Sequence, residues 1–198
     1  MPRTAAQNEA IRDRRKDKII QRSVSLFSTK GFDEITIDDI SKTSHCAHGL
    51  FYHYFDVKED LYNATVAFFE TKYPTLLVHC DDLESGNGLE GIQKLLQQYL
   101  TILKSSDSIV HYSRLALVKG QKARTAEKPL LGDDLEKEIL LLVKKGQDDG
   151  SIRKGDPNDI ARLLLNVLIA ETERRLDLDV SNYRPFDSAY LLSLCKAE

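Results

Sequence analysis

The chain has 198 residues, of which 41% are hydrophobic and 30% charged, so a packed core is expected and a disordered chain is excluded. The formal net charge of −3 does not by itself point to nucleic acid. The charge is uneven, however, because residues 1–30 hold eight basic and three acidic side chains. Such a segment either attracts phosphate or is simply a solvated helix face.

Three cysteines, odd in number and widely spaced, argue against a disulfide framework and fit a reducing cytosol. No apolar run approaches the roughly 20 residues that span a bilayer. The N-terminus lacks the apolar segment of a signal peptide. We therefore expect a cytoplasmic protein that does not contact membranes.

Apolar residues recur at helical spacing along most of the chain, and only residues 75–79 could pass as a strand. The pattern predicts an all-α protein of about nine helices. These are expected near residues 9–30, 37–44, 47–54, 57–72, 89–105, 107–119, 132–149, 157–178 and 185–196. A polar loop is expected at 80–88.

Start and stop signals agree with these boundaries. Capping boxes are expected at 36–39 and 56–59, and Asp156 precedes a proline at a first helical position. Four glycines are expected at helix ends, namely Gly31, Gly120, Gly146 and Gly150.

Residues 36–61 carry the strongest functional signal. They predict two short helices joined by a tight turn, which is helix-turn-helix geometry. Apolar residues of these helices are spaced to pack on the first helix and the residues after it: Ile37, Ile40, Phe51 and Phe55 on Ile20, Val24, Phe27 and Phe32.

If the phenylalanines of the second helix face inward, its other side chains face outward. The leading end would then approach base edges with Ala47, His48, Gly49 and Leu50. Hydroxyl, imidazole and ammonium groups nearby would reach phosphates: Thr36, Tyr52, His53, Tyr54 and Lys58.

The run GFDEITIDDISKTSHCAHGLFYHYFDVKEDLY, with the helix before it, resembles the TetR/AcrR family of transcriptional regulators over about 50 residues. The later run GQDDGSIRKGDPNDIARLL is similar to the family's entry into its dimer helices. The chain departs from the family at His45, where glycine is usual, and at Leu50, where threonine is common.

The resemblance implies an N-terminal three-helix DNA-binding domain at 1–56 and a C-terminal helical ligand-binding and dimerisation domain at 57–198. It implies a homodimeric repressor that a small-molecule effector releases from a palindromic double-stranded DNA operator. No enzyme activity, cofactor or metal is expected.

Two stripes near the C-terminus predict a two-fold four-helix interface, with internal core as the alternative. The interface residues would be Leu164, Leu165, Leu168, Ile169, Phe186, Tyr190, Leu191 and Leu194. Candidates for an effector pocket are Phe68, Phe69, Tyr99, His111, Tyr112, Arg114 and Asn166.

The sequence allows three other interpretations. Residues 86–91 match GxGxxG, but no strand precedes them and neighbouring acids would repel a pyrophosphate. His45, Cys46, His48 and His53 could bind zinc or copper, although their directions should diverge. A helical binding protein whose helix-turn-helix has lost DNA affinity is the remaining alternative, and His45 is its best support.

Overall fold

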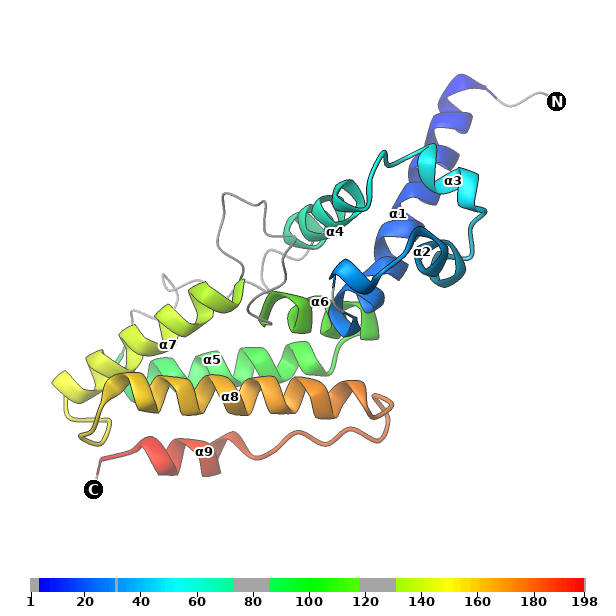
Figure 1. Ribbon diagram of the computed structural model, residues 1–198. Coiled ribbons are helices and arrows are strands. Elements are labelled where there is room, and N and C mark those ends of the chain that lie inside the picture. The colour runs from blue at the N-terminus through cyan, green and yellow to red at the C-terminus, as the bar shows by residue number, and fades with distance from the viewer. Residues whose placement is uncertain (1–3, 31, 73–85, 118–130, 198) are drawn as a thin grey trace. The chain divides into compact units, whose positions relative to one another are not determined.

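The computed structural model describes residues 4–30, 32–72, 86–117 and 131–197, which form two compact units (Figure 1). The described residues hold nine α-helices, one short 3-10 helix and no strand beyond an isolated bridge between Ile152 and Lys196. The all-α prediction is confirmed. The possible strand at 75–79, most of the polar loop, Gly31 and Gly120 lie outside the described residues.

The first unit contains helices α1 (Ala5–Thr29), α2 (Ile37–Ser44), α3 (His48–Tyr52) and α4 (Lys58–Lys72), with the 3-10 helix η1 (Phe32–Glu34) between α1 and α2. Its core is the predicted one, buried as Ile20, Val24, Phe27, Phe32, Ile40, Phe51 and Phe55. Ile37 is only half-buried because it is the first residue of α2. Helix α4 packs on α1, so the first unit extends past residue 56. The functional domain boundary expected after residue 56 remains a prediction.

Capping explains where the helices of the first unit begin. Thr4 and Gln7 form a capping box that starts α1 four residues earlier than expected. The box of Thr36 and Asp39 is confirmed. The expected box at 56–59 is wrong by one residue: α4 begins at Lys58, and Asp60 accepts the amides at 56 and 57.

The second unit contains α5 (Gly88–Leu103), α6 (Asp107–Leu117), α7 (Leu131–Asp148), α8 (Pro157–Leu176) and α9 (Ser188–Cys195). Helix α7 packs against both α5 and α8, and α6 packs on α8 (Figure 1). Side chains such as Leu96, Leu103, Ile139, Val143 and Leu168 are completely buried between them. No helix in the described ranges has the length and apolar character to cross a bilayer.

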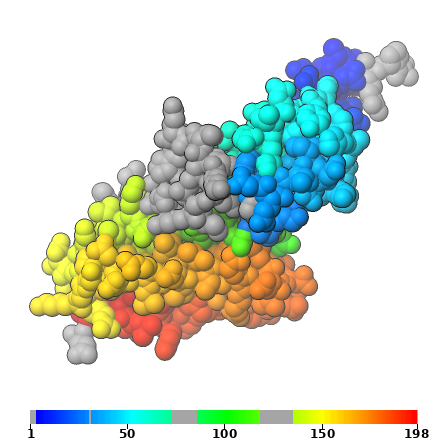
Figure 2. Space-filling model, in the orientation of Figure 1, coloured from blue at the N-terminus to red at the C-terminus, as the bar shows by residue number. Residues whose placement is uncertain are grey.

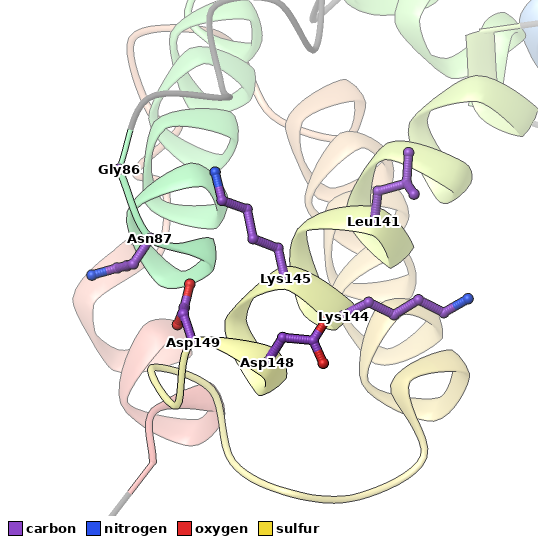
Figure 3. A pocket seen from close by; sticks show the side chains of 7 residues that line it. All are labelled: Gly86, Asn87, Leu141, Lys144, Lys145, Asp148 and Asp149. Atoms are coloured by element: carbon purple, nitrogen blue, oxygen red, sulfur yellow. The ribbon is translucent and has the colours of Figure 1, made fainter.

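The GxGxxG match is explained by packing. A Cβ on Gly88 would lie 2.2 Å from the backbone nitrogen of Gly146, and one on Gly91 would lie 2.5 Å from the side chain of Leu142. These glycines let the start of α5 cross the end of α7, beside an open groove (Figure 3). Asn87 caps α5, so the motif builds a helix crossing. Gly146 lies inside α7 and not at its end, so the expectation of a helix end there is wrong by two residues. Gly150 follows the end of α7 and has φ +78°.

A buried arginine anchors the end of α8. Arg175 is 1% exposed, and its guanidinium donates to the carbonyl oxygen of Leu103 at 2.8 Å and to the Asp107 carboxylate at 2.7 Å. Because a buried cation is costly without acceptors, these bonds fix α8 against the end of α5 and the start of α6.

Candidate nucleic-acid interface

The turn between α2 and α3 has the backbone conformation that glycine normally supplies. His45 has φ 51° and ψ 48°, the only positive φ of a non-glycine residue in the part of the chain that the structure describes. The Cys46 amide donates to the carbonyl oxygen of Ser41 at 2.9 Å, which closes the end of α2. The turn therefore forms with histidine in it, at a strain cost of about 1 kcal/mol.

Helix α3 turns its phenylalanines inward, as predicted. Phe51 is completely buried and Phe55 nearly so, whereas Ala47, His48 and Gly49 are exposed. No atom lies within 4 Å of a Cβ built on Gly49, so the surface beside it is open.

The other α3 candidates divide by exposure. Tyr52 and His53 are exposed, whereas Leu50 and Tyr54 are half-buried. The helix ends at Tyr52, two residues earlier than expected, but the Phe55 amide still donates to the carbonyl oxygen of Phe51 at 3.0 Å. The exposed surface therefore continues past the end of α3.

A contact between helices holds His48. Its Nδ1 lies 2.7 Å from Oδ1 of Asp38, in the first turn of α2, and its ring centroid lies 5.4 Å from that of Tyr52. Asp38 is not among the site residues predicted from the sequence. No spacing rule identifies it, because the contact depends on how α2 and α3 cross.

Thr36 is engaged within its own helix cap. Its hydroxyl accepts from the Asp39 amide at 3.1 Å and donates to the Asp39 carboxylate at 2.8 Å. Hydrogen bonds from the backbone and hydroxyl of Thr36, with help from Lys30, hold the pKa of Asp39 below its ordinary value. A phosphate could take the Thr36 hydroxyl hydrogen only by replacing Asp39.

Lys58 is turned into the first unit and not toward a free surface. Its ammonium donates to the carbonyl oxygens of Phe32 and Ile35, the latter at 2.7 Å, and lies 4.3 Å from the centre of the Phe32 ring. The carbonyls around η1 need donors, and Lys58 supplies them. This corrects the expectation of a Lys58 ammonium free for phosphate.

The basic side chains of α1 supply exposed positive charge. Arg12, Arg14, Arg15, Lys16 and Lys18 are all exposed. Lys16 lies 5.6 Å from the centre of the Phe55 ring, so it borders the segment that follows α3. Position in the sequence did not distinguish Lys16 from its neighbours.

The metal interpretation gains no support from the geometry. His48 is bonded to Asp38, and His45 occupies the left-handed turn. Within the described ranges, no three histidine, cysteine or acidic side chains are grouped to hold a metal ion.

The effector-pocket candidates are distributed over both units. Phe68 and Phe69 belong to α4 of the first unit, with Phe69 buried. In the second unit, Tyr112 is buried and His111 half-buried, and burial lowers the pKa of His111. Asn166 is exposed on α8, so the expectation that it lines an internal pocket is not supported.

The remaining pocket candidates already have polar partners. The Tyr99 hydroxyl lies 2.6 Å from the Thr172 hydroxyl, and burial raises the pKa of Tyr99. The Arg114 guanidinium donates to the Glu173 carboxylate at 2.6 Å. An effector that contacts these groups would compete with bonds between α5 or α6 and α8.

The residues predicted for the dimer interface fall into two groups, which differ in burial. Leu164, Leu165, Leu168 and Leu191 are buried inside the subunit, so the internal-core alternative is correct for them. Tyr190 and Leu194 are exposed, and Ile169 and Phe186 are half-buried. Helix α8 is yellow to orange in Figure 2. Its Leu163 is also exposed, although the sequence-based interface set does not include this residue.

These features define a helix-turn-helix unit joined to a second, helical unit. Residues 19–65 match the family model described as bacterial regulatory proteins, tetR family. The chain therefore carries, at residues 19–65, a domain similar to the DNA-binding domain of that family.

Two curated relatives match part of the chain in sequence. Over 75 residues the chain is 41% identical to the biofilm operon icaADBC HTH-type negative transcriptional regulator IcaR of Staphylococcus epidermidis, covering 37% of this chain and 40% of that one. The Staphylococcus aureus (strain Newman) regulator of the same name is 43% identical over 51 residues, 26% of this chain and 27% of its own. The matches thus span less than half of these relatives.

Three solved structures share the fold at low identity. The ketosteroid transcriptional regulator KstR2 of Mycobacterium tuberculosis superposes with a TM-score of 0.63 at 19% identity, over 93% of this chain and 96% of that one. AibR, solved with isovaleryl coenzyme A and operator DNA, gives 0.63 at 15% identity over 91% and 95%. A gamma-butyrolactone receptor gives 0.61 at 18% identity over 81% and 83%.

Proposed function

We propose that this protein is a homodimeric transcriptional repressor that binds a palindromic DNA operator and is released from it by a small-molecule effector. The observation that carries the proposal is the orientation of α3. Ala47, His48 and Gly49 are exposed while Phe51 is buried, so one surface of the helix is open for base edges in the major groove.

The positive charge for phosphate binding comes mainly from α1. Its exposed arginines and lysines, with Lys16 near the end of α3, sit in the same unit as the recognition surface. Tyr52 and His53 are the exposed polar side chains at the end of α3. Phosphate contacts by these groups would make binding fall steeply with salt.

Dimerisation would place two recognition helices on successive turns of the major groove, about 34–36 Å apart. Exposed and half-buried apolar side chains of the second unit are the best candidates for the contact. They are Leu163 and Ile169 of α8, Tyr190 and Leu194 of α9, and Phe186 just before α9.

The effector would bind in the second unit and favour a spacing of the recognition helices that does not fit DNA. The AibR complex with isovaleryl coenzyme A and the gamma-butyrolactone receptor, which share this fold, support a small molecule as effector. Binding should raise the melting temperature of the protein, because a ligand specific for the folded state stabilises it.

DNA binding is tested by fluorescence anisotropy with the DNA upstream of the protein's own coding region. We expect salt-dependent binding that falls at least tenfold in His48→Ala with Tyr52→Ala. Glu59→Ala with Asn63→Ala, two exposed residues of α4, is the control and should bind at least as tightly as the wild type, because it removes a negative charge. Equal binding by both double variants would contradict the assigned surface.

The alternative of a helix-turn-helix without DNA affinity rested on His45. The left-handed turn accommodates this residue with its backbone hydrogen bonds intact, so the main support for that alternative is weak. A helix-turn-helix without DNA affinity would show no salt-dependent retention on random DNA.

A further inference from the structure

The imidazole of His48 contacts two side chains. Nδ1 lies 2.7 Å from the Asp38 carboxylate, and the ring is tilted by 41° against the Tyr52 ring at a centroid distance of 5.4 Å. The side chains of His48 and Asp38 are 51% and 71% exposed, so the pair lies on the open surface of the helix-turn-helix. A carboxylate of the bracing helix therefore orients the first residue of the recognition helix.

The carboxylate decides which nitrogen carries the hydrogen. An ionised carboxylate only accepts hydrogen bonds, so the nitrogen that faces it must be protonated. In the neutral imidazole this leaves Nε2 with a free lone pair. Asp38 belongs to the first turn of α2, where the helix dipole favours its negative charge.

We propose that Asp38 is a positioning residue for base readout: it fixes His48 with Nδ1 protonated and Nε2 presented to DNA as an acceptor. In the major groove, such an acceptor matches the exocyclic amines of cytosine and adenine and opposes the carbonyl oxygens of guanine and thymine. At one position in each half-site, the contacted strand should therefore carry cytosine or adenine. This inference rests on the proposed function, in which α3 enters the groove.

A simpler role for Asp38 makes a different prediction. A carboxylate near DNA repels phosphates, and removing it raises affinity for every sequence by the same factor. A positioning residue instead changes the preference among bases at one position. The two roles are therefore separated by base preference and not by affinity.

The DNA test uses the full-length dimer and an operator selected from a random library. Relative binding of the four bases is measured at each position for the wild type and for Asp38→Ala, Asp38→Asn and His48→Ala. We expect a preference of about tenfold among the four base pairs at one position per half-site, with cytosine or adenine on the strand that His48 contacts. Asp38→Ala and His48→Ala should flatten that same position, whereas Asp38→Asn, whose amide oxygen can still accept from Nδ1, should keep it.

Glu34→Ala is the charge-matched control, since Glu34 is an exposed carboxylate of η1 in the same unit. It should raise affinity for all sequences and leave the preference unchanged. If Asp38→Ala behaves like Glu34→Ala, or if His48→Ala leaves the base preference unchanged at every position, the inference is overturned.

A second measurement needs no DNA. Long-range proton–nitrogen NMR reports directly which ring nitrogen of His48 carries hydrogen. We expect hydrogen on Nδ1 in the wild type and in Asp38→Asn, and on Nε2 in Asp38→Ala. Hydrogen on Nε2 in the wild type would overturn the inference alone. The expected tautomer in a protein that binds no DNA would overturn the proposed function, and with it base readout, while the orientation of His48 by Asp38 would stand.

Discussion

The guanidinium of Arg22 on α1 donates to the backbone carbonyl oxygen of Ser44 at 2.9 Å, directly before the turn residue His45. Ser44 is the last residue of α2, whose terminal carbonyls have no partner inside the helix. A cation at this end also suits the helix dipole. One member of the basic N-terminal segment thus holds the turn in place.

Replacing His45 by glycine should stabilise the first unit. Glycine adopts a positive φ without steric cost, so His45→Gly should raise the free energy of unfolding by up to about 1 kcal/mol. Urea unfolding measures the change. His53→Gly is the control, because His53 has φ −73° and its replacement should be neutral or destabilising. Destabilisation by His45→Gly would show that the histidine side chain itself supports the turn.

Gly88→Ala should be severely destabilising. The added carbon would lie 2.2 Å from the backbone nitrogen of Gly146, and backbone cannot rotate away as a side chain can. We expect a loss of about 2 kcal/mol or more, seen as a fall in melting temperature. Gly49→Ala meets nothing within 4 Å and should be neutral or stabilising by about 1 kcal/mol. Similar melting temperatures for the two variants would contradict the close crossing of α5 and α7.

Asp39 gives the first unit an acid-sensitive helix cap. Its pKa is lowered from the ordinary 3.8 by the hydrogen bonds of Thr36, so its stabilising contribution is full above that pH and is lost as the pH falls through the lower folded-state value. Asp39→Asn should therefore be less stable than the wild type at pH 7, and the gap should shrink below about pH 4. Melting temperatures between pH 7 and pH 2 check this, and a gap that stays constant would argue against it.

The exposed residues of α9 test the dimer. Tyr190 and Leu194 are 72% and 44% exposed, so Tyr190→Asp with Leu194→Asp should leave the subunit folded while introducing charge into the proposed interface. Sedimentation should show monomers, and operator affinity should fall because two half-sites are no longer bound together. A variant that remains dimeric would place the interface elsewhere. Leu168→Ala, at a completely buried residue, should instead lower stability by about 2–5 kcal/mol.

Much of the recognition unit could be predicted because its signals are local. The burial of Phe51 and Phe55 follows from helical spacing, and the cap at Thr36 follows from residue types three positions apart. The left-handed conformation of His45 agrees with the glycine that the family usually has at this position.

The remaining features depend on contacts between distant segments. Asp38 meets His48 across two helices, and Lys58 reaches carbonyls more than 20 residues away. The apolar stripe of α8 does not show whether a helix of the same subunit or of a partner subunit covers it. The pattern therefore allowed Leu164 and Leu168 to be either interface or core residues. These contacts depend on how the helices pack on one another. The spacing of residues along a single helix does not predict that packing.

The most direct test of the account is a methylation-interference footprint on the selected operator. Methylation at N7 of guanine blocks the major groove, and methylation at N3 of adenine blocks the minor groove. We predict interference from guanine N7 in two half-sites about 34–36 Å apart, with loss of the pattern in His48→Ala with Tyr52→Ala. Interference from adenine N3 alone, or a single site without its symmetric mate, would contradict the placement of α3 in the major groove by a two-fold dimer.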